Sequence, residues 1–295
     1  MVNYPKLSAQ QQQDLPRLIQ ADAIAKSFED STHQLWQCNT TDGMMMLKVC
    51  DETSVKQSSF WQGMTLLFDV DLPAQLGKFQ AVHTQLAVLS PLQIPDYIAS
   101  NSRDNNITPA FILTEWLTGG TVDPAKVNDK MVVTLAQHIS QLHCHQHHCA
   151  GAMHSAKIST SQWSEKLQNT LKQLAKQQNI PKDIINKAIT LTAQYTPDYY
   201  VPVMIDLRWD QFLQQQGRLT ALVDLDALVY APRELDLVLL EYILNKRQAE
   251  IFSQHYQHKL PDLMIVRYIY RLILFMMNIL GEKDLDSWLS SPTRF

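Results

Sequence analysis

The spacing of apolar residues changes part-way along this 295-residue chain, and that change constrains its fold more than any other feature. Before residue 118, short strand-like apolar runs occur at residues 24–28, 34–39 and 44–49. The sequence Thr41-Asp42-Gly43 separates the last two runs, and it predicts a hairpin because glycine tolerates the positive φ of a tight turn. A small antiparallel sheet is therefore expected to begin the fold.

The rest of the first part adds a helix-spaced segment at residues 76–89 and further strands at residues 94–98 and 110–114. Beyond residue 118 helical spacing dominates, over residues 131–148, 161–178, 182–195 and 235–245. Short strands interrupt this pattern at residues 201–205, 211–213 and 219–225. The sequence predicts an α+β chain of two lobes, with a small sheet-containing lobe at residues 1–117 and a mainly helical lobe at residues 118–295.

The composition favours a folded protein and accommodates a small neutral or cationic partner most easily. Hydrophobic residues make up 45% of the chain, which is enough for a substantial core. Only 18% of residues are charged and the net charge is −4, so nucleic acid and anionic membrane surfaces are unfavourable partners. The most apolar stretch, residues 264–280, contains Arg267 and Arg271, each of which would cost about 2.5 to 3.5 kcal/mol in a bilayer. We expect a buried amphipathic helix there.

The four cysteines are too few for a disulfide scaffold and have no zinc-ribbon spacing. The first residues lack the basic start and apolar stretch of a signal peptide. We therefore expect reduced thiols and a cytoplasmic protein.

Three polar side chains accompany the short strands of the second part. Asp206 follows the run at residues 201–205, Gln211 lies five positions later, and Asp224 ends the next pair of strands. The spacing of the two aspartates fits one hairpin between them. Two carboxylates and an amide gathered on neighbouring loops are typical of a phosphotransfer site.

This segment resembles the catalytic segment of the aminoglycoside phosphotransferase, choline kinase and fructosamine kinase superfamily, whose pattern is His-Gly-Asp, four residues, Asn, a hairpin and Ile-Asp. The sequence from Tyr230 to Leu237 is similar to a fructosamine kinase segment that ends Arg-Glu-x-Asp-Leu, in which Asp236 would brace the catalytic loop. The pair Leu142-His143 and the side chain of Trp163 also match family positions. The resemblance spans most of the chain and implies a bilobal, protein-kinase-like fold.

The resemblance further implies an ATP-dependent kinase that uses Mg²⁺ and acts on a small molecule. Asp206 would orient the substrate hydroxyl or accept its proton, and Arg208 would stabilise the transferred charge. Gln211 and Asp224 would be the magnesium ligands.

The nucleotide would also contact the first lobe. The strand Met46-Leu47-Lys48-Val49 is similar to the family strand whose lysine, here Lys48, binds the α- and β-phosphates. Residues 111–117 resemble the hinge that reads adenine through its backbone, with Glu115 and Leu117 as the candidate contacts.

The chain departs from the family pattern at several of these positions. Met204-Ile205 stands in place of His-Gly, and Gln211 in place of Asn. The expected phosphate loop, residues 28–33, contains no glycine, and the helix around residues 60–68 offers Gln62 where a glutamate partner for Lys48 is expected. These departures motivate a second hypothesis, a binding module that keeps the fold without turnover.

Two further features each allow two interpretations. Residues 143–149 are rich in histidine and cysteine, and His143 with His147 could chelate a metal on one helical face. We favour the alternative of a helix end whose histidines offset the helix dipole, with Ala150-Gly151 as the stop. Trp209 is either a platform for stacking a substrate or a packing residue.

Overall fold

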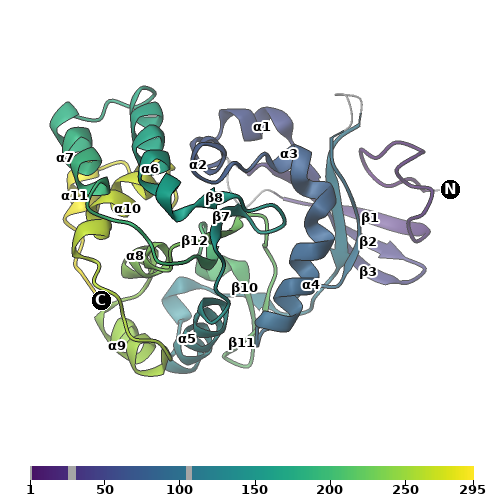
Figure 1. Ribbon diagram of the computed structural model, residues 1–295. Helices are drawn as coiled ribbons and strands as arrows, with labels where there is room; N and C mark the ends of the chain where they lie inside the picture. Colours follow the sequence, from purple (N-terminus) through teal and green to yellow (C-terminus); the bar gives the residue numbers. More distant parts are fainter. Residues whose placement is uncertain (1, 26–30, 104–107) are drawn as a thin grey trace.

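The computed structural model describes residues 2–25, 31–103 and 108–295 (Figure 1). A five-stranded antiparallel sheet lies at one end of the molecule, and most of the helices lie at the other (Figure 1). This arrangement has the mixed α+β composition predicted from the apolar spacing.

The five-stranded sheet has the order β1-β2-β3-β5-β4. Its strands are β1 (Leu18–Ile24), β2 (His33–Thr40), β3 (Gly43–Cys50), β4 (Tyr97–Asn101) and β5 (Phe111–Glu115). The predicted hairpin joins β2 to β3, and Gly43 has a φ of 120° that favours glycine. The strand expected at residues 24–28 falls mostly outside the described residues, whereas β1 begins six residues earlier than expected.

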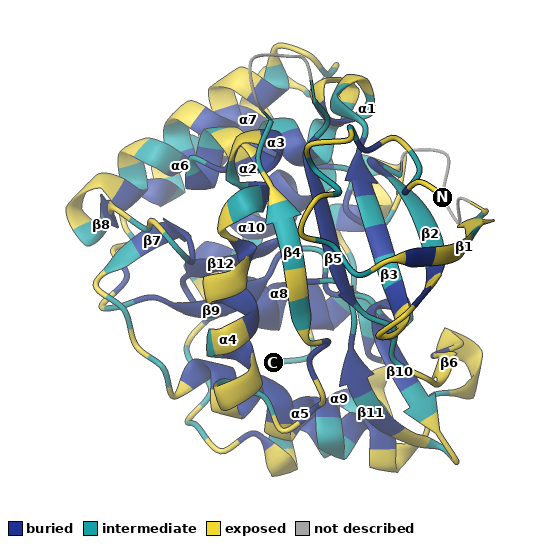
Figure 2. Ribbon diagram, turned by 90° about the vertical axis from the view of Figure 1, so that its right-hand side faces the viewer, coloured by how far each residue is buried: buried dark blue, intermediate teal, exposed yellow. Residues whose placement is uncertain are grey.

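Short helices follow β3 and cover one face of this sheet. They are α1 (Glu52–Gln57), α2 (Ser59–Phe68), α3 (Leu72–Gln75), the 3₁₀ turn η1 (Leu76–Lys78) and α4 (Phe79–Leu89). Polar side chains start them, since Asp51 accepts hydrogen bonds from the backbone of α1 and Asp71 does so for α3. The opposite face packs against Tyr4 and Leu7 of the N-terminal segment, so β3 and β5 are buried at the centre of the sheet (Figure 2).

The second part contains seven α-helices within the described residues. They are α5 (Asp129–His143), α6 (Thr160–Ala175), α7 (Lys182–Thr192), α8 (Glu234–Ile243), α9 (Lys246–His255), α10 (Met264–Met276) and α11 (Leu285–Leu289), with a 3₁₀ turn η2 (Pro124–Lys126). The predicted helices at residues 161–178, 182–195 and 235–245 correspond to α6, α7 and α8.

Two small sheets lie among these helices. One has the order β11-β10-β6, from β6 (Gly120–Thr121), β10 (Phe212–Gln215) and β11 (Arg218–Leu222). The other has the order β8-β7-β12-β9, from β7 (Cys149–Ala152), β8 (Ile158–Ser159), β9 (Val201–Met204) and β12 (Leu228–Ala231). The strand β12 was not among the predicted strands.

The helix predicted over residues 131–148 is wrong at its C-terminal end. Helix α5 ends at His143, and the chain then turns into β7. The backbone of His147 exchanges two hydrogen bonds with that of Tyr200, and its ring stacks on Tyr230 with the centroids 4.2 Å apart. These contacts hold His147 away from the helix, so His143 and His147 do not share a helical face.

A single apolar core extends from the helices that precede residue 117 into those that follow it. Helix α2 packs against both α6 and α10. The approach is close at Gly63, where a Cβ atom would overlap the side chain of Met277 at the C-terminal end of α10. The two predicted lobes share this core, so the boundary between them at residue 117 stays a prediction.

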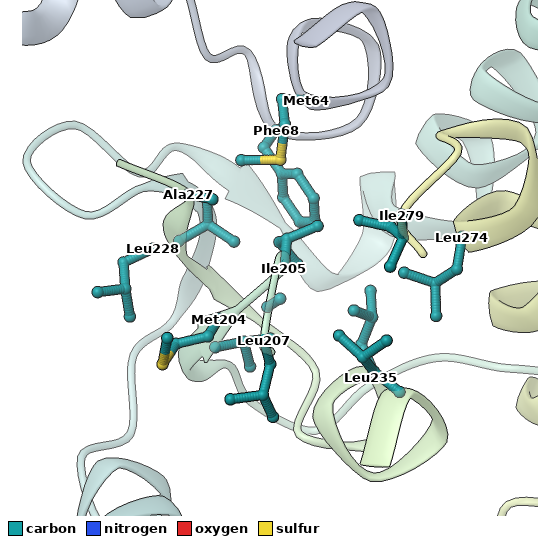
Figure 3. Close-up of a cluster of buried hydrophobic side chains, with 14 of the residues drawn as sticks. Met64, Phe68, Met204, Ile205, Leu207, Ala227, Leu228, Leu235, Leu274 and Ile279 are labelled. Carbon is teal, nitrogen blue, oxygen red and sulfur yellow. The ribbon is translucent and has the colours of Figure 1, made fainter. Parts of the chain in front are cut away.

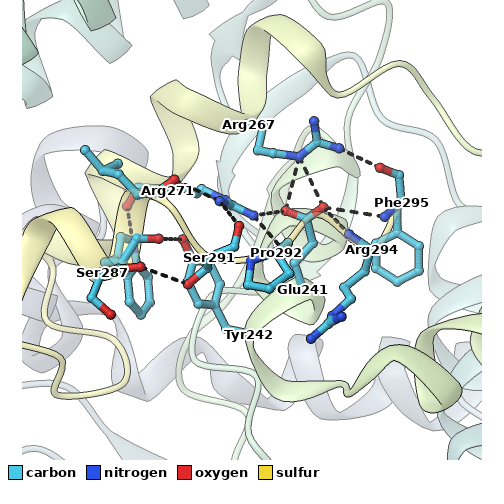
Figure 4. A network of polar contacts seen from close by, with 11 residues as sticks. Glu241, Tyr242, Arg267, Arg271, Ser287, Ser291, Pro292, Arg294 and Phe295 are labelled. Carbon is cyan, nitrogen blue, oxygen red and sulfur yellow. Dashed lines mark hydrogen bonds and ion pairs between the residues drawn. The ribbon is translucent and has the colours of Figure 1, made fainter.

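Helix α10 is the buried amphipathic helix expected within residues 264–280. Both of its arginines bind the buried Glu241 of α8, Arg267 through Nε at 3.1 Å and Arg271 through Nη2 at 2.7 Å (Figure 4). Within the described ranges, we find no helix with the length and apolar character needed to cross a bilayer.

Candidate active site

Two loops bring the predicted phosphotransfer residues together. Asp206 lies in the turn that follows β9, and Asp224 lies in the loop that follows β11. Between them, Gln211 ends the 3₁₀ turn η3 (Trp209–Gln211) and leads into the β10–β11 hairpin. The backbone N–H of Val223 donates to the carbonyl of Gln211 at 3.0 Å, which fixes the two loops to each other.

Apolar burial anchors the loop that carries Asp206. Met204 and Ile205, which stand where the family pattern has His-Gly, are almost completely covered. In the core, Ile205 lies next to Phe68 of α2, and Met204 lies beside Leu207 (Figure 3). The loop is thus attached through hydrophobic packing at positions where the family has a polar side chain and a glycine.

A buried polar network supports the same loop from behind. Asp236 on α8 accepts a hydrogen bond from the backbone N–H of Met204 at 3.2 Å, the bracing contact expected from the Arg-Glu-x-Asp-Leu segment. The other carboxylate oxygen lies 3.1 Å from His143, whose second ring nitrogen lies 2.7 Å from the Tyr256 hydroxyl. Burial raises the pKa of Asp236 and lowers that of His143 to about 3, so a neutral acid–imidazole pair is favoured.

Asp206 and Gln211 face each other. Nε2 of Gln211 donates to Oδ2 of Asp206 at 3.0 Å. Gln211 is only 3% exposed, and its Oε1 is buried with no hydrogen-bond partner. A buried amide oxygen without a donor is costly, so this atom is available to a cation or donor that enters the site. Burial, and secondly the charge of Asp224, raises the pKa of Asp206 to about 7.

Lys48 extends from the central strand β3 to the second loop. Its Nζ lies 2.8 Å from Oδ1 of Asp224 and 3.4 Å from Oδ2 of Asp226. Burial opposes the charge on Lys48, but the two carboxylates outweigh it and raise the pKa of the ammonium group. Burial likewise opposes the charge on Asp224, yet Lys48 lowers its pKa to about 2. The sheet and the second part thus meet through an ion pair.

Two residues of this cluster were missed as site candidates in the sequence. Asp226 is 8% exposed, and its Oδ2 also lies 3.7 Å from Nδ1 of the buried His33 at the start of β2. The signal for Asp226 was its position two residues after Asp224. No periodicity marks His33, because its proximity to Asp226 depends on the way the sheet packs against the loop.

The hinge candidates lie where the sheet passes into the second part. The backbone N–H of Glu115 donates to the carbonyl of Asp96 at 2.8 Å, and that of Trp116 donates to the carbonyl of Met44 at 3.1 Å. Leu117 follows at the end of this connection and is half-buried.

Arg208 and Trp209, which follow Asp206 in the sequence, make different contacts. The Nε of Arg208 lies 3.2 Å from Oδ1 of Asp210, and its charge moderates the raised pKa of Asp206. Trp209 is buried and donates its indole N–H to the carbonyl of Ile243 at 3.3 Å. These contacts favour the packing interpretation of Trp209.

Residues 28–30 of the expected phosphate loop, residues 28–33, lie outside the described residues. Of its last residues, Thr32 accepts a hydrogen bond from the indole of Trp61 on α2 at 3.1 Å. Gln62 on the same helix bonds to the carbonyl of Lys56, and so it is not a partner of Lys48.

The oxygen donors of Asp224 and Gln211 fit magnesium better than a transition metal. Over the ranges that the structure describes, no three histidine, cysteine, aspartate or glutamate side chains gather as a metal site, and this includes residues 143–149. Magnesium commonly takes one or two protein ligands and completes its shell with phosphates and water. The carboxylate of Asp224 and the unpartnered oxygen of Gln211 are suitable for such a site.

Comparison with known proteins also indicates a phosphotransferase. The family model described as "Phosphotransferase enzyme family" matches residues 31–264. No curated protein matches the chain. Solved structures share its fold at low identity, and among them is a protein assigned as a fructosamine-3-kinase from Haemophilus somnus 129PT, with a TM-score of 0.60, 14% identity and coverage of 95% of this chain and 91% of that chain.

Two antibiotic phosphotransferases are similar to a comparable degree. The macrolide 2'-phosphotransferase MphH from Brachybacterium faecium has a TM-score of 0.59 and 14% identity over 97% of this chain and 94% of that chain. The streptomycin–ATP complex of APH(2")-IIa has a TM-score of 0.54 and 14% identity over 91% and 87%. The predicted kinase-like α+β fold is therefore confirmed. The chain belongs to the phosphotransferase enzyme family.

Proposed function

We propose that this protein is an ATP-dependent kinase that phosphorylates a hydroxyl group of a small molecule. The observation that carries the proposal is the ion pair between Lys48 of β3 and Asp224 of the second part, at 2.8 Å, next to the Asp206–Gln211 pair. One cluster thus contains a cation for phosphate, two oxygen donors for magnesium and a carboxylate for the substrate hydroxyl.

Each side chain has a distinct role in this proposal. Magnesium, when bound, neutralises the phosphate charge and aligns the phosphates for transfer. Asp224 and Oε1 of Gln211 would hold it, Lys48 would bind the α- and β-phosphates, and Asp206 would orient the attacking hydroxyl or take its proton. A carboxylate whose pKa is about 7 can accept that proton near neutral pH.

Arg208 stabilises charge on the transferred phosphoryl group once it leaves Asp210. Glu115 and Leu117 contribute backbone groups to adenine binding. The complex of APH(2")-IIa with streptomycin and ATP supports ATP as the nucleotide.

The proposed substrate is a neutral or cationic metabolite, such as an amino sugar, a glycated amine or an aminoglycoside-like compound. The net charge of −4 supports this choice. We place the protein in the cytoplasm, where ATP and magnesium are supplied.

Phosphate transfer from labelled ATP to a panel of sugars, amino sugars and glycated amines tests the proposal. The parent should phosphorylate at least one class, and Asp206→Asn should lose about a hundredfold or more in kcat, within the range that general acid–base groups contribute. Equal rates for parent and variant across the panel would end the kinase assignment.

A second candidate function is a binding module without turnover. The specific observation in its favour is that Lys48 contacts both Asp224 and Asp226, so an internal cation already neutralises a proposed magnesium ligand. Thermal-shift measurements discriminate between the candidates, because a magnesium-dependent rise with ATP favours the kinase and no rise favours the module.

A further inference from the structure

The proposed function, on which this inference rests, gives Asp224 two competing partners. In the structure Asp224 pairs with Lys48 at 2.8 Å, whereas as a magnesium ligand it must direct its oxygens at the metal. If Asp224 were the sole carboxylate beside Lys48, metal binding would leave a largely buried ammonium group without an anionic partner, which is costly. A second carboxylate is therefore required near Lys48.

The helices that cover the sheet do not supply that carboxylate. Helices α2 and α4 contain no acidic residue. Five acidic residues lie between β3 and β4, and four of them have other partners. Asp51 and Asp71 cap helices, Glu52 pairs with Arg103, Asp69 pairs with Lys166, and the fifth, Asp96, is exposed.

Helix α4 instead contributes an imidazole near the cluster. Burial lowers the pKa of His83, and the charges of Lys48 and Asp226 act on it in opposite directions. His83 is itself bound through Nδ1 to the carbonyl of Pro95 at 2.9 Å. His83 is therefore influenced by the charges of Lys48 and Asp226 but offers no negative charge of its own.

The geometry points to Asp226 as the residue that positions Lys48. Its Oδ2 lies 3.4 Å from the ammonium nitrogen, and it is 8% exposed where Asp224 is 39% exposed. The buried ring of His33 lies 3.7 Å from the same oxygen. The more accessible carboxylate is free to exchange Lys48 for the metal, and the enclosed one keeps the ammonium group in place for the phosphates.

This division of roles predicts a specific defect in Asp226→Asn. With one carboxylate left, Lys48 and magnesium compete for Asp224, so more magnesium is needed for nucleotide binding. We expect the magnesium concentration at half-maximal ATP binding to rise about tenfold, and the affinity for ATP at saturating magnesium to fall about tenfold. A purely structural role of Asp226 would not move the magnesium requirement.

The experiment uses calorimetry to measure ATP binding by the full chain at a series of magnesium concentrations. It compares the parent, Asp226→Asn, Lys48→Met and the double variant, with Asp198→Asn as a control because Asp198 is an exposed aspartate. In the Lys48→Met background, Asp226→Asn should have no further effect on ATP affinity.

The outcomes separate the two claims. If the parent shows no magnesium-dependent ATP binding, the proposed function and this inference both fail. If the parent binds and Asp226→Asn has an unchanged magnesium requirement, this inference alone is overturned.

Thermal stability keeps the inference testable if Asp226→Asn folds poorly. Removing the carboxylate leaves the Lys48 ammonium underpaired, so adding Lys48→Met to Asp226→Asn should raise the midpoint of thermal unfolding. A double variant no more stable than Asp226→Asn would contradict the pairing.

Discussion

At the scale of single residues, the unpartnered oxygen of Gln211 is the most informative feature of the site. Its Nε2 is bound to Asp206 while its Oε1 is buried without a donor. A side chain kept in this costly arrangement is typical of a functional position. Under the proposed function, Gln in place of the family Asn would keep an oxygen for the metal on a longer side chain.

Gln211→Leu separates stability from binding. The leucine removes the costly unpartnered oxygen at similar volume, and it also removes the hydrogen bond from Nε2 to Asp206. Because these two effects oppose each other, the midpoint of thermal unfolding should stay within a few degrees of the parent value. Magnesium-dependent ATP affinity should fall about tenfold or more, because a metal ligand is lost.

Calorimetric titration with ATP, with and without magnesium, measures this effect. Gln173→Leu on the exposed side of α6 is the matched control. Parent-like magnesium-dependent affinity in Gln211→Leu would rule out Gln211 as a ligand.

His138 predicts a pH dependence of stability. It is fully buried on α5, where burial, and secondly repulsion from the His143 ring when that ring is protonated, lowers its pKa to about 3. Between that value and the unfolded pKa of about 6.5, the unfolded chain binds a proton that the folded chain does not, so stability falls as pH falls.

From pH 8 to pH 5 this one histidine removes about 2 kcal/mol from the free energy of unfolding. Urea denaturation of parent and His138→Gln across this interval should show a shallower loss in the variant. Parallel curves would mean that His138 takes up its proton at the same pH in the folded and the unfolded chain, which would contradict the lowered pKa.

At the scale of secondary-structure elements, helix α10 and the C-terminal segment are held by one carboxylate. Glu241 accepts from Arg267 and Arg271, and also from the backbone N–H of Arg294 at 2.9 Å (Figure 4). Arg271 extends the network to the carbonyl of Ser291 at 2.7 Å. The arginines that argued against a membrane helix thus bind a buried acid.

Glu241→Ala should destabilise the protein by about 3 to 5 kcal/mol, because it leaves a buried guanidinium group without its counter-charge. Arg247→Ala breaks the exposed pair with Asp129 and should cost about 0.5 kcal/mol or less. Urea denaturation of both variants makes the comparison. A loss in Glu241→Ala as small as that in Arg247→Ala would contradict the structural role of the network.

The elements also show where sequence-based prediction succeeds. The β2–β3 hairpin and helices α6, α7 and α8 were predicted because turn chemistry and apolar spacing are local signals. The end of α5 was misplaced because His147 is held by a long-range contact with Tyr200. Strand β12 was missed because its four buried residues are too few to give a period.

At the scale of the whole molecule, the site forms where the five-stranded sheet contacts the second part of the chain, through Lys48 and Asp224. Order along the chain and a family resemblance were sufficient to select Asp206, Gln211, Asp224 and Lys48 as candidates. Neither Asp226 nor His33 was selected, because their contact depends on how β2 packs against a loop nearly 200 residues away. Local patterns carry no information about such a contact.

The continuous core predicts how thermal unfolding responds to the proposed ligand pair, ATP and magnesium. Since apolar packing runs from α2 to α10, ATP with magnesium should raise one cooperative unfolding transition rather than the first of two. Differential scanning calorimetry with and without the ligand pair measures this. Two transitions, of which only one moves, would contradict a single cooperative core.

A crystal structure of the protein with magnesium and a non-hydrolysable ATP analogue tests the central claim most directly. We predict magnesium bound to Asp224 and to Oε1 of Gln211, with Lys48 on the α- and β-phosphates and the terminal phosphate facing Asp206. A nucleotide bound elsewhere, or magnesium that contacts neither Asp224 nor Gln211, would contradict the account.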